Sequence, residues 1–223
     1  MARLEYGPTS LEVIALAAAD PVMDRVTRAV GEVSVGVDPD HFHSLASAIV
    51  GQQLSGAAAA TIWGRFAALG PVEPAAILGL EEATMRSVGL SGQKARYLRD
   101  LAERVHAGDL DLAALEGLDD ESVVAEVTRV KGIGRWTAEM FLLFSLERPD
   151  VLAVDDGGLV RAAGWALELG RPATAAEFAS AGEAWRPYRS VASLYLWACL
   201  DRGFVPRTGQ PGGLTPREAA NRR

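Results

Sequence analysis

The stretch VKGIGRWTAEM, from Val130 to Met140, carries the strongest structural signal in this chain. Its glycines, Gly132 and Gly134, separate two segments whose apolar residues recur at helical spacing. Glycine reaches backbone conformations that other residues avoid, so this step permits a tight reversal with Ile133 plugging the core. The helix that starts after the turn exposes backbone N–H groups, which suit a phosphate. The stretch therefore predicts a helical hairpin, either as a plain corner or as a phosphate grip.

The composition indicates a folded protein. Of the 223 residues, 49% are hydrophobic and 23% are charged, as in ordinary globular domains, and the length allows one large domain or two small ones. No apolar run is long enough to span a membrane, and the first residues lack a signal-peptide core. We therefore expect a cytoplasmic protein with no membrane partner. The one cysteine, Cys199, excludes an internal disulfide.

The net charge of −7 counts against a broad basic DNA-binding surface. The objection is not decisive, because backbone amides and helix dipoles hold a few phosphates without global basicity. The two lysines, Lys94 and Lys131, are both expected in or beside glycine-containing turns. A nucleic-acid partner is compatible with this charge.

The apolar residues follow a helical rather than an alternating period, which predicts an all-α protein. The segment GEVSVGV, from Gly31 to Val37, is the best strand candidate. Because the tail from Gly203 onward is rich in glycine and proline, we expect it to be loosely ordered. Helices are expected over residues 11–19, 24–30, 43–69, 74–80, 81–88, 93–106, 110–115, 120–129, 136–146, 158–167, 175–185 and 188–200.

An acidic pair, Asp155 and Asp156, precedes the expected helix GGLVRAAGWAL. The simplest interpretation is structural, because an aspartate before a helix commonly caps its N-terminus. The functional interpretation is that one carboxylate caps while the other faces a cleft. A carboxylate beside a sugar can stabilise an oxocarbenium-like transition state and orient or deprotonate water.

Several blocks together resemble a known family. GIGRWTAEMFLL followed by DVLAVDDGGLVRA is similar to the helix-hairpin-helix DNA glycosylases, most closely the 3-methyladenine DNA glycosylase II branch. Three further blocks occur in the family's order. They are ASAIVGQQLSGAAAATIWGRF (residues 46–66), GLSGQKARYLRDLA (89–102) and WRPYRSVASLYLW (185–197).

The resemblance implies an all-α, two-lobed fold with a catalytic cleft between the lobes. One lobe is expected to combine residues 1–38 with 150–205. The other spans residues 39–149 and ends in the helix-hairpin-helix motif (120–146), and a loosely ordered tail (206–223) follows. The residues before the shared region are too few for the extra N-terminal domain of the family's longer members.

By position, the resemblance makes Asp156 the catalytic aspartate and Asp155 a structural neighbour. The hairpin is expected to bind a DNA phosphate, and a monovalent cation is expected on the carbonyls of Val130 and Ile133. We expect no side-chain metal site and no cofactor. The DNA-binding residues expected in the hairpin are Lys131, Gly132, Ile133, Gly134, Arg135 and Thr137.

Trp136 stands where lyase-competent relatives carry a nucleophilic lysine, so the resemblance implies base release without strand cleavage. An indole can also hold a cationic base by a cation–π contact of roughly 0.5–2 kcal/mol, although core packing is the alternative. Trp185 is expected as a further pocket wall, or as part of a structural corner. Met140 and Gly157 replace bulky aromatics of better-known members, which predicts a wider pocket.

The block GQQLS implies a residue that fills the gap left by a flipped base. Gln53 holds this position, with Gln52 or Leu54 as alternatives, and Ser55 is expected to contact DNA as well. The competing interpretation is a polar cluster at a helix start.

We therefore predict a monomeric enzyme of the bacterial nucleoid whose partner is damaged duplex DNA. The expected reaction is hydrolysis of the N-glycosidic bond of alkylated purines, such as 3-methyladenine and 7-methylguanine, which initiates base excision repair. The alternatives are a non-catalytic lesion sensor that binds DNA and a helical protein-interaction domain.

Overall fold

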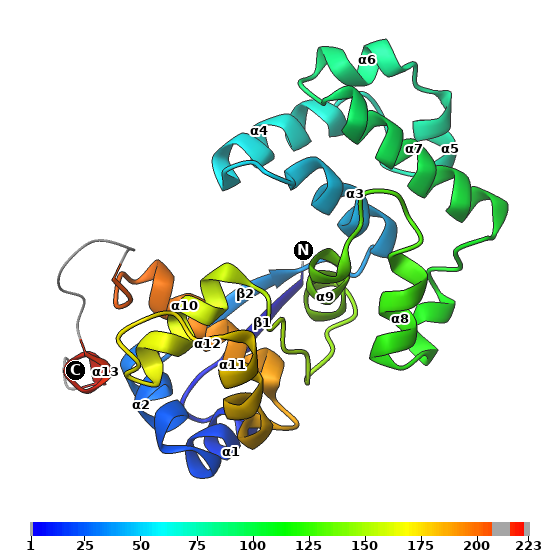
Figure 1. Ribbon diagram of the computed structural model, residues 1–223. Helices are drawn as coiled ribbons and strands as arrows, with labels where there is room; N and C mark the ends of the chain where they lie inside the picture. Colours follow the sequence, from blue (N-terminus) through cyan, green and yellow to red (C-terminus); the bar gives the residue numbers. More distant parts are fainter. Residues whose placement is uncertain (1, 207–214, 221–223) are drawn as a thin grey trace. The chain divides into compact units, whose positions relative to one another are not determined.

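The computed structural model describes residues 2–206 and 215–220 (Figure 1). The helices are α1 (Leu11–Ala19), α2 (Pro21–Val30), α3 (His41–Gly51), α4 (Gly56–Ala67), α5 (Pro74–Gly79), α6 (Glu82–Ser87), α7 (Gly92–Ala107), α8 (Asp120–Val127), α9 (Arg135–Phe144), α10 (Gly157–Ala166), α11 (Ala175–Gly182), α12 (Arg189–Asp201) and α13 (Pro216–Ala220). Two strands, β1 (Ala2–Tyr6) and β2 (Val33–Val37), and two short 3-10 helices, η1 (Ala114–Gly117) and η2 (Glu183–Trp185), complete the elements. The predicted helical class is confirmed. Among the described residues, no helix has the length and apolar character of a membrane span.

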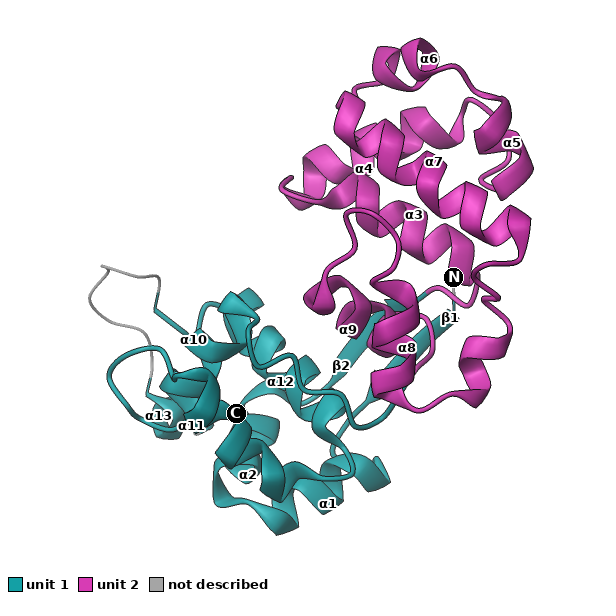
Figure 2. Ribbon diagram, turned by 45° about the vertical axis from the view of Figure 1, so that its right-hand side comes forward, with its two compact units in different colours: residues 1–37, 148–223 teal, residues 38–147 magenta. Residues whose placement is uncertain are grey.

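The chain forms two compact units (Figure 2). Unit 1 combines residues 1–37 with 148–223, and unit 2 is the continuous segment 38–147. The lobe boundaries expected from the sequence lie between residues 38 and 39 and between residues 149 and 150, within two residues of these unit boundaries. The expected cleft between the lobes stays a prediction.

Unit 1 contains a small sheet that the all-α expectation left out. β1 and β2 pair antiparallel, with Ala2 opposite Val37 and Tyr6 opposite Val33. The strand candidate near Val33 is therefore correct, whereas β1 was not predicted. Its residues ARLEY do alternate between apolar and polar side chains, which is a strand signal that the expectation passed over, and their extended form is stabilised by pairing with a strand that is distant in sequence. The hydroxyl of Tyr195 on α12 donates to the carbonyl of Gly31, 2.7 Å away, just before β2.

The expectation of a loosely ordered tail is wrong for residues 215–220, which include α13. Thr215 Oγ1 accepts from the backbone N–H of Glu218, and Glu218 Oε2 accepts from the backbone N–H of Thr215. This reciprocal pair is a capping box, and proline at the first helical position favours the same start. Pro216 and Ala219 are buried. The rest of the expected tail beyond residue 206 lies outside the described residues.

Unit 2 corrects the prediction of one continuous helix over 43–69. The helical segment is instead α3 and α4, separated by the turn Gln52–Ser55. Gln53 adopts a left-handed φ of 58°, which a continuous helix does not allow. Ser55 caps the second helix by accepting from the backbone N–H of Ala58. The expected helix over 110–115 is replaced by the short η1.

Candidate functional site

The predicted hairpin lies in unit 2 and consists of α8, a turn and α9. Ile133 is buried in the turn, as expected. Gly132 has a φ of 84°, and a Cβ added there would lie 2.1 Å from Cδ2 of Tyr97 on α7. Gly134 is the N-cap of α9, and a Cβ added there would meet nothing within 4 Å. The two glycines therefore differ: Gly132 permits close packing, whereas Gly134 leaves open space at a helix N-terminus.

The first turn of α9 offers the donors that a phosphate needs. Gly134 provides no side-chain cap, so the first N–H groups of the helix, including that of Thr137, lack an intrahelical acceptor. These groups and the helix dipole favour an anion. The side chain of Thr137 is itself buried, so only its backbone is suited to the predicted DNA contact.

Lys131 is tied to the protein through Asp100 on α7. Asp100 accepts from the backbone N–H of Lys131 at 3.0 Å and from its Nζ at 2.9 Å, and Arg104 Nε donates to the same carboxylate at 3.0 Å. Burial alone would raise the pKa of Asp100, but the hydrogen bonds from Lys131 and Arg104 bring this pKa below its usual value. The Lys131 side chain is 71% exposed, so its predicted phosphate contact is sterically open and stays a prediction.

Arg135 begins α9 and is held by two acids. It forms an ion pair with Glu121 of α8, and its Nε donates to Glu139 at 3.1 Å. The hydrogen bond from Arg135 lowers the pKa of Glu121. The pairing reduces the charge that Arg135 presents, so its predicted DNA contact would compete with Glu121.

The carbonyl of Val130, one of the two expected cation ligands, accepts from the N–H of Ile133 at 3.1 Å. The cation itself stays a prediction.

The turn Gln52–Ser55, here named the wedge turn, contains the three residues considered for filling the gap that a flipped base leaves. Their contacts and exposure differ. The side chain of Gln52 is engaged, because its Nε2 donates to the carbonyl of Gly132 at 2.7 Å. Gln53 and Leu54 are both exposed. Ser55 serves as a helix cap. Gln53 and Leu54 are therefore the exposed candidates, whereas the side chain of Gln52 is bonded to the hairpin. The gap-filling role stays a prediction.

Asp156, in unit 1, is the N-cap of α10. Its Oδ1 accepts from the backbone N–H of Leu159 at 2.7 Å and from the indole Nε1 of Trp197 at 3.3 Å, and the residue is 9% exposed. Of the acidic pair, Asp156 is therefore the cap and Asp155 is exposed. The expected catalytic role of Asp156 stays a prediction, and it would fall on the capping carboxylate itself. A Cβ at Gly158 would lie 3.0 Å from Asp156 Oδ1, so this glycine leaves room for the carboxylate.

Trp197 is the residue beside Asp156 that the sequence reasoning missed. It belongs to the block WRPYRSVASLYLW, in which the other tryptophan, Trp185, is the one expected in the base pocket. Trp185 is 1% exposed, packs against Phe178 and donates from Nε1 to Asp20 at 2.7 Å. Its assignment to the base pocket is corrected: Trp185 is a core residue of unit 1. Helical spacing alone does not reveal which of two tryptophans faces the core.

The other expected pocket residues lie on exposed or partly exposed surface. Trp136 on α9 is 47% exposed, which does not fit the alternative of core packing. Met140 follows one helical turn later and is half-buried. Gly157 is exposed, and a Cβ there would meet nothing within 4 Å. Their role in a base pocket stays a prediction.

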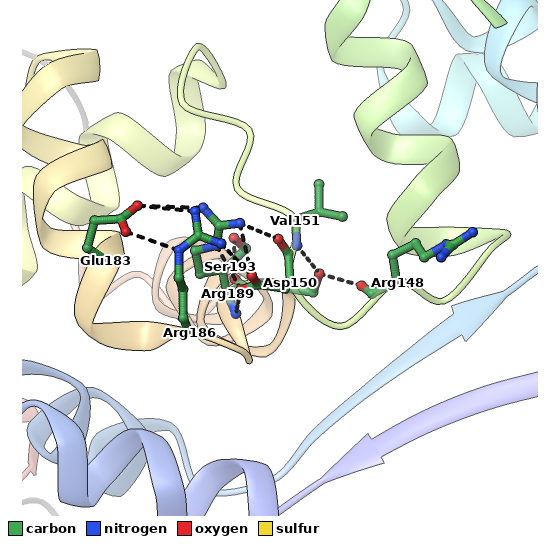
Figure 3. A network of polar contacts seen from close by, with 8 residues as sticks. Arg148, Asp150, Val151, Glu183, Arg186, Arg189 and Ser193 are labelled. Atoms are coloured by element: carbon green, nitrogen blue, oxygen red, sulfur yellow. Dashed lines mark hydrogen bonds and ion pairs between the residues drawn. The ribbon is translucent and has the colours of Figure 1, made fainter. Parts of the chain in front are cut away.

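A polar network in unit 1 holds the segment that leads to Asp156 (Figure 3). Arg189 at the start of α12 donates from Nε to Asp150 at 2.7 Å, and Arg186 donates to the same carboxylate at 2.7 Å. Ser190 donates to the carbonyl of Arg148 at 2.6 Å and accepts from the N–H of Val151 at 2.9 Å. The network therefore fixes the chain a few residues before the acidic pair.

Known proteins are similar to this chain in sequence and in fold. Residues 46–187 match the HhH-GPD superfamily of base excision DNA repair proteins. DNA-3-methyladenine glycosylase 1 of Schizosaccharomyces pombe is 32% identical over 161 residues, which cover 70% of this chain and 71% of the relative.

Two crystal structures are similar. The DNA-3-methyladenine glycosidase of Bacillus halodurans has a TM-score of 0.84 and 37% identity, and the match covers 96% of this chain and 98% of that one. The 3-methyladenine DNA glycosylase of Schizosaccharomyces pombe in complex with abasic DNA has a TM-score of 0.76 and 29% identity, covering 86% and 97%. The chain described here belongs to the HhH-GPD superfamily of base excision DNA repair proteins.

Proposed function

We propose that this protein is a monofunctional DNA glycosylase that hydrolyses the N-glycosidic bond of alkylated purines in duplex DNA and so initiates base excision repair. The substrates are cationic bases such as 3-methyladenine and 7-methylguanine. The names of the relatives support the substrate class. The observation that carries the proposal is the buried carboxylate of Asp156, oriented by two N–H donors at the start of α10.

DNA binding relies on backbone groups, which suits a protein with a net charge of −7. A phosphate accepts from the first N–H groups of α9, where Gly134 leaves the approach open. Such a contact positions the DNA backbone and does not depend on the base sequence. It therefore suits an enzyme that must find damaged bases in any sequence.

The target nucleotide then leaves the duplex, which costs a few kcal/mol for unstacking and unpairing. Gln53 or Leu54 fills the gap in the base stack. The flipped base is cationic because of its alkyl group, so the exposed indole of Trp136 attracts it through a cation–π contact.

The bond that breaks joins C1′ of the sugar to the ring nitrogen of the base. Its electron pair goes to the base, which leaves as a neutral purine and needs no strong general acid. The positive charge moves to the sugar, where the carboxylate of Asp156 stabilises it. Water adds to C1′ and loses a proton, which gives an abasic site. Trp136 has no amine, so it cannot form the Schiff base that strand cleavage requires.

The absence of aromatic side chains at Gly157 and Met140 in the expected pocket supports a broader substrate range. Gly157 has open space where a side chain would be, and Met140 is flexible and narrower than an aromatic ring. We therefore expect release of purines with adducts larger than methyl. Parallel assays on methylated and bulkier alkylated duplexes test this. Release of only the methylated bases would contradict it, and Gly157→Tyr is the variant expected to narrow the range.

The decisive test is base release from alkylated duplex DNA by the wild type and by Asp156→Asn. Asparagine also caps helices, so the variant should keep α10 while losing the charge. We expect a loss of roughly 10²-fold or more, as for the removal of other groups that stabilise transition-state charge. Asp155→Asn is the matched control and should retain most of the activity. Undiminished release by Asp156→Asn would refute the catalytic assignment. Tight binding of abasic DNA with no release from any substrate would favour a lesion sensor.

A further inference from the structure

The wedge turn is held by a partly buried cation, Lys94, which lies in α7 and not in a turn as expected. Lys94 Nζ donates to the carbonyl of Val50 at 2.8 Å and to that of Gln52 at 2.7 Å. The last carbonyls of a helix lack intrahelical donors, and here the ammonium group supplies them to the end of α3. Burial lowers the pKa of Lys94. The position of the wedge turn is therefore set by a side chain from another helix.

The wedge turn is also tied to the hairpin through Gln52. Its Nε2 donates to the carbonyl of Gly132, which belongs to the turn whose N–H groups are proposed to hold phosphate. The bond joins residues 80 positions apart in sequence. It therefore connects the two parts of unit 2 that are expected to touch DNA.

One face of α7 supports both parts. Lys94, Tyr97 and Asp100 follow one another at intervals that place them on the same side of a helix. Lys94 contacts the wedge turn, the ring of Tyr97 packs on Gly132, and Asp100 accepts from Lys131. Wedge turn and hairpin thus share one support, and Gln52 joins them directly.

We propose that Gln52 is a positioning residue that locks the wedge turn to the phosphate-binding hairpin, so that the exposed Gln53 or Leu54 is held ready to fill the gap in the base stack. The inference rests on the proposed glycosylase function. Gln53 has a left-handed φ of 58°, which side-chain-bearing residues adopt at a cost, so the turn needs external contacts to keep this shape. Without the Gln52 bond, the turn relaxes and base flipping slows, while the chemistry at the sugar is unchanged.

The test compares two duplexes that contain the same alkylated purine. In one the purine is paired, and in the other it lies opposite an abasic analogue, so that no base pair must be broken. Single-turnover release is measured for the wild type and for Gln52→Met, which keeps the length of the side chain and removes its donor. We expect release from the paired duplex to fall about 5- to 10-fold, as for the loss of one net hydrogen bond, with much less change on the unpaired duplex.

Two further variants separate positioning from folding. Gln52→Glu replaces the donor by an acceptor that repels the Gly132 carbonyl, and should show at least the same selective loss. Gln93→Met is the matched control: it removes the same chemical group from α7, where that group bonds the hydroxyl of Tyr97. This control should keep the ratio of the two rates, and melting temperatures should verify that all variants are folded. Equal losses on both duplexes, or no loss, would overturn the inference. No release by the wild type from either duplex would instead overturn the proposed function, and the inference with it.

Discussion

Replacing Gly132 by alanine should destabilise the protein far more than the same change at Gly134. At Gly132 the added methyl would lie 2.1 Å from Cδ2 and 2.2 Å from Cε2 of Tyr97, and φ is 84°. The left-handed backbone costs an alanine about 1–2 kcal/mol. Forcing extra volume into packed surroundings adds about 1–3 kcal/mol. The expected loss is therefore about 2–5 kcal/mol, a large part of the roughly 5–15 kcal/mol that stabilises a typical domain.

Urea unfolding of Gly132→Ala, Gly134→Ala and the wild type measures this difference. Gly134 has a φ of −95° and open space for a methyl group, so its variant should unfold near the wild-type midpoint. Gly134→Ala should nevertheless bind abasic DNA more weakly, because its methyl lies where phosphate is expected.

A double-mutant cycle separates the two contributions at Gly132. Tyr97→Ala removes the ring that the new methyl would strike but leaves the backbone strain. The coupling free energy between Gly132→Ala and Tyr97→Ala should therefore be about 1–3 kcal/mol. A Gly132→Ala variant within about 0.5 kcal/mol of the wild type, the range of an ordinary surface substitution, would refute the reasoning.

Three other predictions concern single side chains. Asp100 has a pKa in the folded protein below its ordinary value of 3.8, so the stability that it contributes is present above that pH and is lost as the pH falls through the lower folded value. The free energy of unfolding, measured as a function of decreasing pH, should therefore fall less steeply for Asp100→Asn than for the wild type. Gly158→Ala should place a methyl against the carboxylate of Asp156 and lower base release by roughly 10–100-fold with little change in melting temperature; equal loss of both would point to misfolding instead. Trp185→Phe should lower the unfolding free energy by about 1–3 kcal/mol, because Asp20 Oδ2 loses the donor that the indole supplies. The ratio of methylated to bulkier bases released should stay constant, and a changed ratio would return Trp185 to the pocket.

The sequence was most informative where the structure depends on neighbouring residues. The hairpin follows from glycines placed between two apolar helical patterns, and the cap of α10 follows from an aspartate before a helix. The capping box at Thr215 and Glu218 is equally local, and the glycine-rich composition of the tail obscured it.

Features that depend on distant contacts were not predictable. The alanine-rich segment around α3 and α4 favours a continuous helix, and its interruption is held by Lys94 and by the bond from Gln52 to the hairpin. The alternation of β1 spans five residues, too few to identify a strand without β2 as its partner. The choice between Trp185 and Trp197 depends on packing against Asp20 and Asp156, which one-dimensional spacing does not contain.

Unit 2 is a continuous insertion within unit 1, and this has a consequence for synthesis on the ribosome. Residues 38–147 emerge from the ribosome before residues 148–206, so unit 2 can complete its core first. Until α10 and α12 are synthesised, residues 1–37 lack the helices that they pack against in unit 1. The hydrogen bond from the Tyr195 hydroxyl to the Gly31 carbonyl, for example, can form only once a further 164 residues have been synthesised after Gly31. At roughly 5–20 residues per second, this wait lasts on the order of 10 s. During that time Met23 and Val26, fully buried in the finished protein, have no completed core, so the N-terminal segment is where a nascent chain is most open to chaperones and to aggregation.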